Sequence, residues 1–378
     1  MKKKICFIAS VPNGINSFQR TNIERLSEKY DVYAIANFKD KSELGNIKIT
    51  DAFPVAIERR PNIRQNIKAL KELYHIFRDQ KFDCFVSMSC NASLLAAIAG
   101  KMAYIPFRIR IFTGQVWANM SGIKRKIFKC LDRLTVILNT QTMVDGQAQF
   151  NFLSEREIIN PEKAKCMPNI VGIDTSLFRP DKAVRTKERK KLSIPNDAFV
   201  YAFLGRINRD KGIFELLGAA DKLFSEKSNA CLVLIGPMEN GLTSAIIESY
   251  TNLKLGKNTF FYGKTTQPYN ALCIADVFCL PSYREGFGLS VLEASATQLP
   301  VICSDAYGMQ SAYEENVTGL KCKMKDVDSL YNCMRRLYEE PEFAHTLGMN
   351  GRNRVEERFN KDFISKCWVD YLSETIDK

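Results

Sequence analysis

Residues 276–293 read DVFCLPSYREGFGLSVLE. The apolar run that opens this stretch is typical of a buried strand ending at Pro281, and the segment 289–296 predicts a helix that ends before Pro300. A loop with two glycines joins the two elements. Glycines let the backbone approach a ligand closely, and the N–H groups that open a helix carry partial positive charge. The stretch therefore predicts a site for an anionic group.

Two glutamates frame this predicted anion site. Glu285 lies in the loop and Glu293 lies in the helix, eight positions further on. At about 1.5 Å per helical residue the two lie at most about 12 Å apart. Such carboxylates could bind two hydroxyl-bearing parts of one ligand, with its phosphates between them. The alternative is that Glu285 is a surface loop acid and Glu293 a solvated helix residue.

A second motif, LGRINRDKG at residues 204–212, ends another predicted strand. Arg206 and Lys211 flank its turn, and a helix is predicted to begin after Gly212. Arginine offers a bidentate fork and lysine a point charge, and together they suit a diphosphate. Alone, the motif could be a basic surface turn. Beside the first anion site, it indicates a nucleotide diphosphate ligand.

Strands alternate with helices along most of the 378 residues, which predicts two α/β units, each with a parallel doubly wound sheet. The domain change is expected after residue 175, giving domains 1–175 and 176–360, with residues 181–191 as charged linker. The expected strands are 4–10, 31–36, 83–88, 107–112, 198–204, 232–235, 259–262, 277–280 and 301–303. The expected helices are 17–30, 63–79, 92–103, 214–225, 329–340 and 363–375.

Composition restricts the class of protein. The 12 cysteines form no CxxC pair and there are only two histidines, which favours reduced core thiols over disulfides or a metal site. No apolar run reaches the ~18 residues of a membrane-spanning helix. Residues 1–170 hold 27 Lys and Arg against 15 Asp and Glu, whereas the remainder is balanced. The basic half could bind nucleic acid, anionic membrane or a phosphorylated substrate.

The stretch 123–138 predicts an amphipathic helix in the basic half. Its apolar stripe comprises Ile123, Ile127, Cys130, Leu131, Leu134, Ile137 and Leu138, and its basic side comprises Arg125, Lys126, Lys129 and Arg133. One interpretation is a helix that faces the core and leaves its basic side solvated. The other is a basic side that meets anionic lipid, each cation contributing ~1 kcal/mol.

These motifs resemble those of retaining family 4 glycosyltransferases, which have the GT-B fold of two Rossmann-like domains. The resemblance rests on GR-x4-KG at 205–212, on PS-x2-EGFG at 281–288 and on the spacing of the two glutamates. It implies that Arg206 and Lys211 bind the donor diphosphate and act in catalysis, with Glu285 at the transferred sugar and Glu293 at the ribose. It also implies that further donor contacts come from Gly14, Gly205, Gly263, Lys264, Gly286, Phe287, Gly288 and Leu289.

One departure from the family concerns the end of strand 107–112. Many members have a histidine there, whereas this chain has Thr113, so no histidine role is carried over. The sequence TGQVW, which includes Gln115, resembles a subgroup that builds bacterial O-antigens and capsules, often on undecaprenyl-linked acceptors. Thr113, Gln115 and the four cations of helix 123–138 are therefore candidates for acceptor or membrane contact. In GT-B enzymes the last helix, here 361–378, often packs on the first domain.

The expected activity is transfer of a sugar, an N-acetylated hexosamine or a deoxyhexosamine, from a UDP-sugar to a lipid-linked acceptor. No cofactor and no metal are expected, and the enzyme is expected in the cytoplasm, bound to the inner face of the plasma membrane. An alternative on the same fold is a nucleotide-sugar epimerase. Nucleic-acid binding is not expected, because the basic half shows no interleaved aromatic and basic residues.

Overall fold

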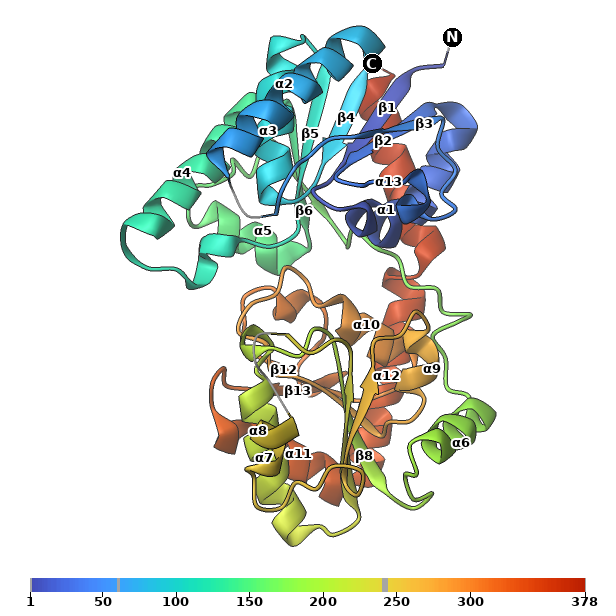
Figure 1. The fold of residues 1–378 in the computed structure, drawn as a ribbon. Helices are drawn as coiled ribbons and strands as arrows, with labels where there is room; N and C mark the ends of the chain where they lie inside the picture. Colours follow the sequence, from blue (N-terminus) through green and yellow to red (C-terminus); the bar gives the residue numbers. More distant parts are fainter. Residues whose placement is uncertain (1, 60–61, 240–243, 378) are drawn as a thin grey trace. The chain divides into compact units, whose positions relative to one another are not determined.

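A computed structural model describes residues 2–59, 62–239 and 244–377 (Figure 1). The chain divides into two compact units. Unit 1 comprises Met1–Gly172 with Lys361–Lys378, and unit 2 comprises Ile173–Asn360. The division falls after Gly172, whereas the sequence interpretation placed it after residue 175.

Unit 1 contains a seven-stranded sheet in the order β3-β2-β1-β4-β5-β6-β7. Every neighbouring pair is parallel, as expected for a doubly wound sheet. The order reverses between β1 and β4, which lie side by side at the centre. The strands are β1 (Lys4–Ile8), β2 (Asp31–Ala36), β3 (Asp51–Pro54), β4 (Cys84–Ser87), β5 (Phe107–Phe112), β6 (Gln141–Asp145) and β7 (Ala164–Met167).

Helices cover both faces of this sheet (Figure 1). Helix α3 packs between α2 and α4, and α13 packs against α1. Helix α13 buries Trp368 completely, and Ser365 and Ser373 of α13 bond to Thr21 and Tyr30. The helices are α1 (Pro12–Lys29), α2 (Ile63–Gln80), α3 (Cys90–Met102), α4 (Gly122–Leu138), α5 (Gln147–Ser154) and α13 (Lys361–Ile376).

Unit 2 contains a six-stranded parallel sheet in the order β10-β9-β8-β11-β12-β13. Its strands are β8 (Phe199–Leu204), β9 (Ala230–Ile235), β10 (Thr259–Gly263), β11 (Val277–Leu280), β12 (Val301–Ser304) and β13 (Gly319–Cys322). Its helices are α6 (Lys182–Lys191), α7 (Ile213–Glu226), α8 (Ser244–Glu248), α9 (Pro268–Leu272), α10 (Leu289–Ala296), α11 (Val327–Glu339) and α12 (Pro341–Arg358). The strand order reverses between β8 and β11.

Two sequence expectations about elements were wrong, and several elements were missed. Helix α1 begins at Pro12 and not at Ser17, because proline fits the first turn of a helix, where no N–H partner is needed. The stretch expected as linker is helix α6, held by Arg185 and Arg189, which both pair with Asp276 at the start of β11. The sequence analysis did not predict strands β3, β6, β7 and β13, nor helices α5, α8, α9 and α12.

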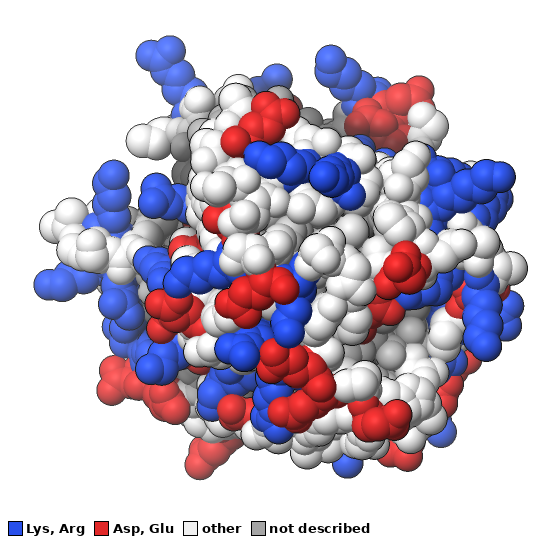
Figure 2. Space-filling model, turned by 90° about the horizontal axis from the view of Figure 1, so that it is seen from below, with Lys and Arg blue, Asp and Glu red and all other residues white. Residues whose placement is uncertain are grey.

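The charges do not gather into one basic field on the face drawn in Figure 2, where acidic and basic side chains are interspersed. Many of the surface cations are paired, as in Lys222 with Asp328 and Arg336 with Glu340. In the part of the chain that the structure describes, no helix combines the length and apolarity that crossing a bilayer requires.

Candidate active site

The two motifs singled out in the sequence follow the two central strands of unit 2. Residues 205–212 follow β8 and residues 281–288 follow β11, and these strands are hydrogen-bonded neighbours. Their carboxyl ends lie at the point where the strand order reverses. In open α/β sheets, ligands bind in the crevice that forms at this point. The topology thus places both predicted anion-binding loops at the preferred ligand position.

Hydrogen bonds hold the two loops together. The N–H of Tyr283 donates to the carbonyl of Asp210 at 2.8 Å, and the Ser282 hydroxyl oxygen lies 3.3 Å from the same carbonyl oxygen. A Cβ on Gly212 would lie 2.0 Å from the Pro281 carbonyl oxygen, and Gly212 has φ +69°. Only glycine fits there without moving the loop. The close approach of the loops is therefore built into the backbone.

Lys211 and Glu285 form an ion pair across these loops. Both side chains are half-buried, and the Ser282 hydroxyl donates to the same Glu285 oxygen at 2.8 Å. The Asn208 side chain accepts the Lys211 backbone N–H at 3.2 Å, and so fixes the short turn η3 (Arg209–Lys211). Glu285 is therefore not a free surface acid. A cation and an acceptor lie side by side, suited to a phosphate and a neighbouring hydroxyl.

Arg206 lies in the same loop but has a different partner. Its guanidinium pairs with Glu239, which follows β9, at 2.9 Å, and Asn208 donates to the same carboxylate oxygen at 3.1 Å. Sequence analysis missed Glu239 and Asn208. The signal that could have identified Glu239 is its position shortly after the buried strand β9. Because β9 neighbours β8 and parallel strands bring their carboxyl ends to one edge, an acid there lies near Arg206. Arg206 is thus held by an internal anion.

Glu293 lies inside α10, which begins after Gly288 in the left-handed conformation at φ +94°. The residue is half-buried, and no described residue forms a hydrogen bond or an ion pair with its carboxylate. Burial raises the pKa of the Glu293 carboxyl to about 7. An unpaired carboxyl of this kind is typical of functional sites, where an external ligand supplies the missing partners.

The remaining loop positions differ in what they expose. Phe287 is buried against Phe359, with ring centroids 5.7 Å apart, so its side chain anchors the loop. A Cβ on Gly308 would lie 2.2 Å from the carbonyl oxygen of Glu285, so the loop after β12 packs directly against the backbone of the 281–288 loop. Sequence analysis missed this support, which involves contact between loops far apart in the chain. Gly205 and Gly286 lie in the two motif loops themselves.

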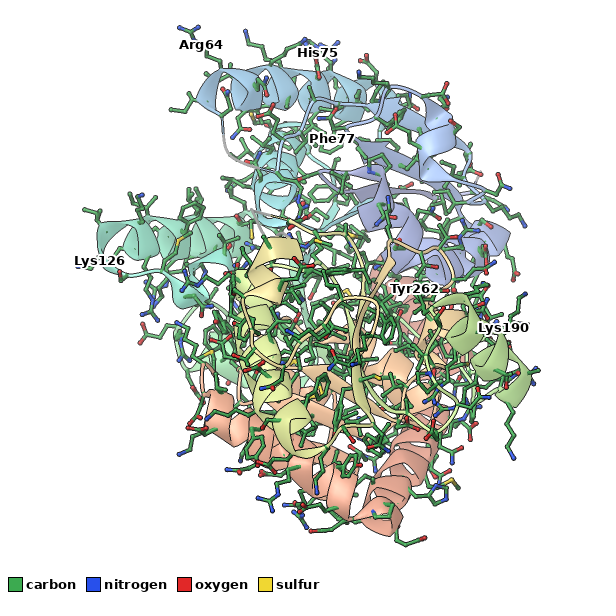
Figure 3. The ribbon with its side chains drawn as sticks, turned by 60° about the horizontal axis from the view of Figure 1, so that its bottom comes forward. Arg64, His75, Phe77, Lys126, Lys190 and Tyr262 are labelled. Carbon is green, nitrogen blue, oxygen red and sulfur yellow. The ribbon has the colours of Figure 1, made fainter. Side chains whose placement is uncertain are left out.

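The segment expected to meet a nucleotide base, Gly263 and Lys264, lies at the end of β10, the edge strand of the sheet. Gly263 closes β10 at φ +81°, and its carbonyl accepts the Gly236 N–H at 2.9 Å. Lys264 beside it is exposed. Tyr262 points to α6, where its hydroxyl donates to buried Glu188 at 2.9 Å (Figure 3). Burial and this carboxylate raise the pKa of Tyr262 to about 12.

In unit 1, the expected contact residues lie on separate elements. Gly14 lies in the first turn of α1, beside Ala9 at the end of β1. Thr113 is exposed directly after β5, whereas Gln115 is buried. Buried Trp117 of the same loop donates through Nε1 to Asp132 of α4 at 2.6 Å, and Asp132 also pairs with buried Arg110. This polar cluster fixes both the loop and helix α4.

The four cations of α4 do not form a single outward basic side. Arg125 and Lys129 are half-buried and lie over the Trp117 ring, 6.0 and 5.6 Å from its centroid. Arg133 bonds to the Arg156 and Glu157 carbonyls and pairs with the Glu157 carboxylate. Lys126 alone of the four is exposed. The interpretation of α4 as a core-facing apolar helix with a solvated basic side was wrong.

Residues 184–354 match the family described as "Glycosyl transferases group 1". This range includes both motif loops, Glu293 and Glu239. Unit 2 carries a group 1 glycosyltransferase domain. The chain is a transferase, and the epimerase alternative has no support from the proteins to which it is similar.

Similarity extends over nearly the whole chain. A capsular polysaccharide biosynthesis glycosyltransferase, CapM of Staphylococcus aureus, is 26% identical over 366 residues, covering 96% of this chain and 94% of the relative. An Escherichia coli UDP-Gal:alpha-D-GlcNAc-diphosphoundecaprenol alpha-1,3-galactosyltransferase is 24% identical over 388 residues, covering 98% of each. Sucrose-phosphate synthase of Thermosynechococcus elongatus superposes with a TM-score of 0.82 at 20% identity, over the full length of both chains. The fold is GT-B.

Proposed function

We propose that the enzyme transfers a sugar from a UDP-sugar to an undecaprenyl-linked acceptor in the synthesis of a bacterial surface polysaccharide, with retention of anomeric configuration. The observation that carries the proposal is the Lys211–Glu285 pair where β8 and β11 end. The similar E. coli enzyme, by its name, uses UDP-Gal and a diphosphoundecaprenol acceptor. We expect the transferred sugar to be an N-acetylated hexosamine or a deoxyhexosamine.

In the proposed complex the donor diphosphate lies between the start of α10 and the two cations. Lys211 and Arg206 neutralise its charge, Glu285 accepts a hydroxyl of the transferred sugar, and Glu293 accepts the ribose hydroxyls. Backbone N–H groups of Gly288 and Leu289 complete the phosphate contacts. The base lies along the Gly263–Lys264 edge. Each of these partners belongs to unit 2.

The proposed reaction is a substitution on one face of the sugar. The bond between the anomeric carbon and the diphosphate oxygen breaks, and its electron pair stays on that oxygen. A hydroxyl or phosphate oxygen of the acceptor bonds to the anomeric carbon from the same face, and its proton passes to the departing diphosphate. Lys211 and Arg206 stabilise the charge that develops on the leaving group, which is the main catalytic contribution expected from the protein.

The enzyme is proposed to act at the cytoplasmic face of the plasma membrane, because its acceptor is held there by a lipid. It is proposed to need no cofactor and no metal, since Arg206 and Lys211 supply positive charge at the diphosphate. Thr113, which is exposed directly after β5 in unit 1, is proposed to contact the acceptor, whereas Gln115 is buried beneath that loop and is not available for such a contact.

The test is a screen of UDP-sugars for UDP release, with and without undecaprenyl phosphate or an undecaprenyl diphosphate-linked sugar. Lys211→Ala and Glu285→Gln should each lower transfer by at least about a hundredfold, because each removes a contact to the reacting part of the donor. The matched control is Lys222→Ala, which removes a surface ion pair between Lys222 of α7 and Asp328 of α11. Lys222→Ala should transfer at the wild-type rate. Unchanged transfer by Lys211→Ala would contradict the proposal.

A further inference from the structure

Helix α4 exposes the side that its sequence would normally bury. Four large apolar residues lie along this side, and we call them the α4 stripe: Ile123, Ile127, Leu134 and Ile137, which are 75%, 52%, 41% and 73% exposed. Cys130 is exposed between them. The stripe spans about 21 Å at about 1.5 Å per residue. A continuous exposed apolar face of this length marks a surface that meets a partner.

The rotation of α4 about its axis is set by the buried polar cluster beneath it. Asp132 follows Ile123 by nine residues, which at about 100° per residue places it on the opposite side of the helix. Asp132 is fixed there by Arg110 and Trp117, both at 2.6 Å. Phe128 packs from this side into the cluster around Phe112, Trp117 and Leu153. The α4 stripe is therefore held outward by contacts that cost much to break.

The exposed charges that α4 itself carries are positive, and the exposed acid Glu157 beside the helix is paired with Arg133. Lys124 and Lys126 are exposed on α4, and Figure 3 shows Lys126 on the outer side of the helix. The sole acid between residues 113 and 138 is Asp132, which is buried. An apolar face bordered by lysines is the pattern of a helix that lies in the surface of an anionic bilayer.

Exposed apolar and basic residues also lie in the turn after α3, which is bonded to the C-terminal end of α4. Arg108 donates to the carbonyls of Leu138 and Ile105, at 2.9 and 2.6 Å, and so ties the end of α4 to the turn after α3. That turn exposes Met102 and Tyr104, by 53% and 88%, beside exposed Lys101. Tyrosine is enriched where proteins meet the membrane interface.

We propose that the α4 stripe inserts into the surface of an anionic lipid bilayer, with α4 lying along the membrane and Lys124 and Lys126 at the headgroups. The inference rests on the proposed function in one respect: an enzyme with a lipid-linked acceptor works at this surface. It differs from a purely basic contact, because the apolar side meets the membrane while Arg125 and Lys129 stay against Trp117.

Binding to vesicles tests the proposal with the full chain. The stripe variant carries Ile123→Gln, Ile127→Gln, Leu134→Gln and Ile137→Gln, all at exposed positions where glutamine keeps the helix. The matched control carries Leu177→Gln and Val317→Gln, two apolar residues of unit 2 that are 48% and 46% exposed. Sedimentation with vesicles of phosphatidylglycerol and phosphatidylethanolamine, and with phosphatidylcholine alone, measures the binding.

The wild type and the control should bind the anionic vesicles equally well, and the stripe variant about tenfold or more weakly. Lys124→Gln and Lys126→Gln should each weaken binding to anionic vesicles about fivefold, and not to phosphatidylcholine. If the stripe variant binds vesicles as the wild type does, the proposal is wrong. If the wild type is a dimer and the stripe variant is a monomer that still binds vesicles, a second copy of the chain covers the stripe instead.

UDP binding, measured by titration calorimetry without vesicles, separates this inference from the proposed function. The stripe lies in unit 1, so the stripe variant should bind UDP as the wild type does. Failure of the wild type to bind UDP would contradict the proposed function and leave the vesicle result standing. Loss of UDP binding in the stripe variant alone would indicate a folding defect, and Lys124→Gln with Lys126→Gln would then decide the outcome.

Discussion

The unpaired carboxyl of Glu293 should make the stability of the enzyme depend on pH. Burial raises its pKa from 4.5 to about 7. Between these values the folded protein holds a proton that the unfolded chain has released, so the free energy of unfolding falls as pH rises through this window. At about 1.4 kcal/mol per pKa unit, the ionised carboxylate costs the fold up to about 3 kcal/mol above pH 7. This is an upper limit, because the residue is only half-buried and solvent screens part of the charge.

Glu293→Gln removes this cost, because glutamine is neutral at every pH and nearly the same size. At pH 8 the variant should be more stable than the wild type by up to about 3 kcal/mol, and at pH 5 by about 1 kcal/mol or less. Urea unfolding followed by circular dichroism at pH 5, 6, 7 and 8 measures this difference. The control is Glu357→Gln, at an exposed position of α12, which should show no such trend.

The same variant should lose UDP binding at pH 8 by about tenfold or more, because a neutral amide accepts ribose hydroxyls less strongly than a carboxylate. Stability and binding would then change in opposite directions, as expected of a residue that serves ligand binding at the expense of stability. A stability difference that stays constant from pH 5 to pH 8 would refute the reasoning. It would mean that Glu293 ionises as an ordinary solvated glutamate.

Two further predictions concern ion pairs. Glu239→Gln should strengthen UDP binding about fivefold, because Arg206 would no longer be paired with a carboxylate of the protein itself. Titration calorimetry measures this binding. Weaker binding would indicate that Arg206 does not meet the diphosphate. Asp132→Asn should lower the free energy of unfolding by about 3–5 kcal/mol, because buried Arg110 would lose its carboxylate. Urea unfolding tests the second, with Asp362→Asn, an exposed partner of Arg25, as a control that costs less than about 1 kcal/mol.

The central strands and the loops of the site could be predicted from local sequence. Strand β5, strand β11 and helix α10 have the predicted bounds, because a short apolar or alternating run with proline or glycine near its ends leaves little choice of structure. Because strands alternate with helices along the chain, the sheet is parallel and the motif loops lie at the carboxyl ends of adjacent strands. The meeting of Lys211 with Glu285 follows from the same topology.

Other parts depend on contacts that no local pattern contains. Helix α6 has the composition of a solvated linker, yet Glu188 and Arg189 are buried because Tyr262 and Asp276, far along the chain, supply their partners. Strands β7 and β13 are as short as β11, but each contains a lysine, so neither forms the uninterrupted apolar run that marks β11. Glu239 was missed for a similar reason, since its partner Arg206 is 33 positions away.

Helix α4 shows most clearly which features the sequence determined and which the tertiary structure determined. The sequence by itself determined that residues 123–138 form a helix with one apolar side, because the apolar residues repeat at the helical period, and the helix observed is Gly122–Leu138. It could not determine which side faces solvent, since burying that apolar side would be the usual outcome. The tertiary structure decided this through Asp132, whose buried charge must face Arg110 and Trp117. An unpaired charge in the core costs more than exposed isoleucines, and so the apolar side lies outward.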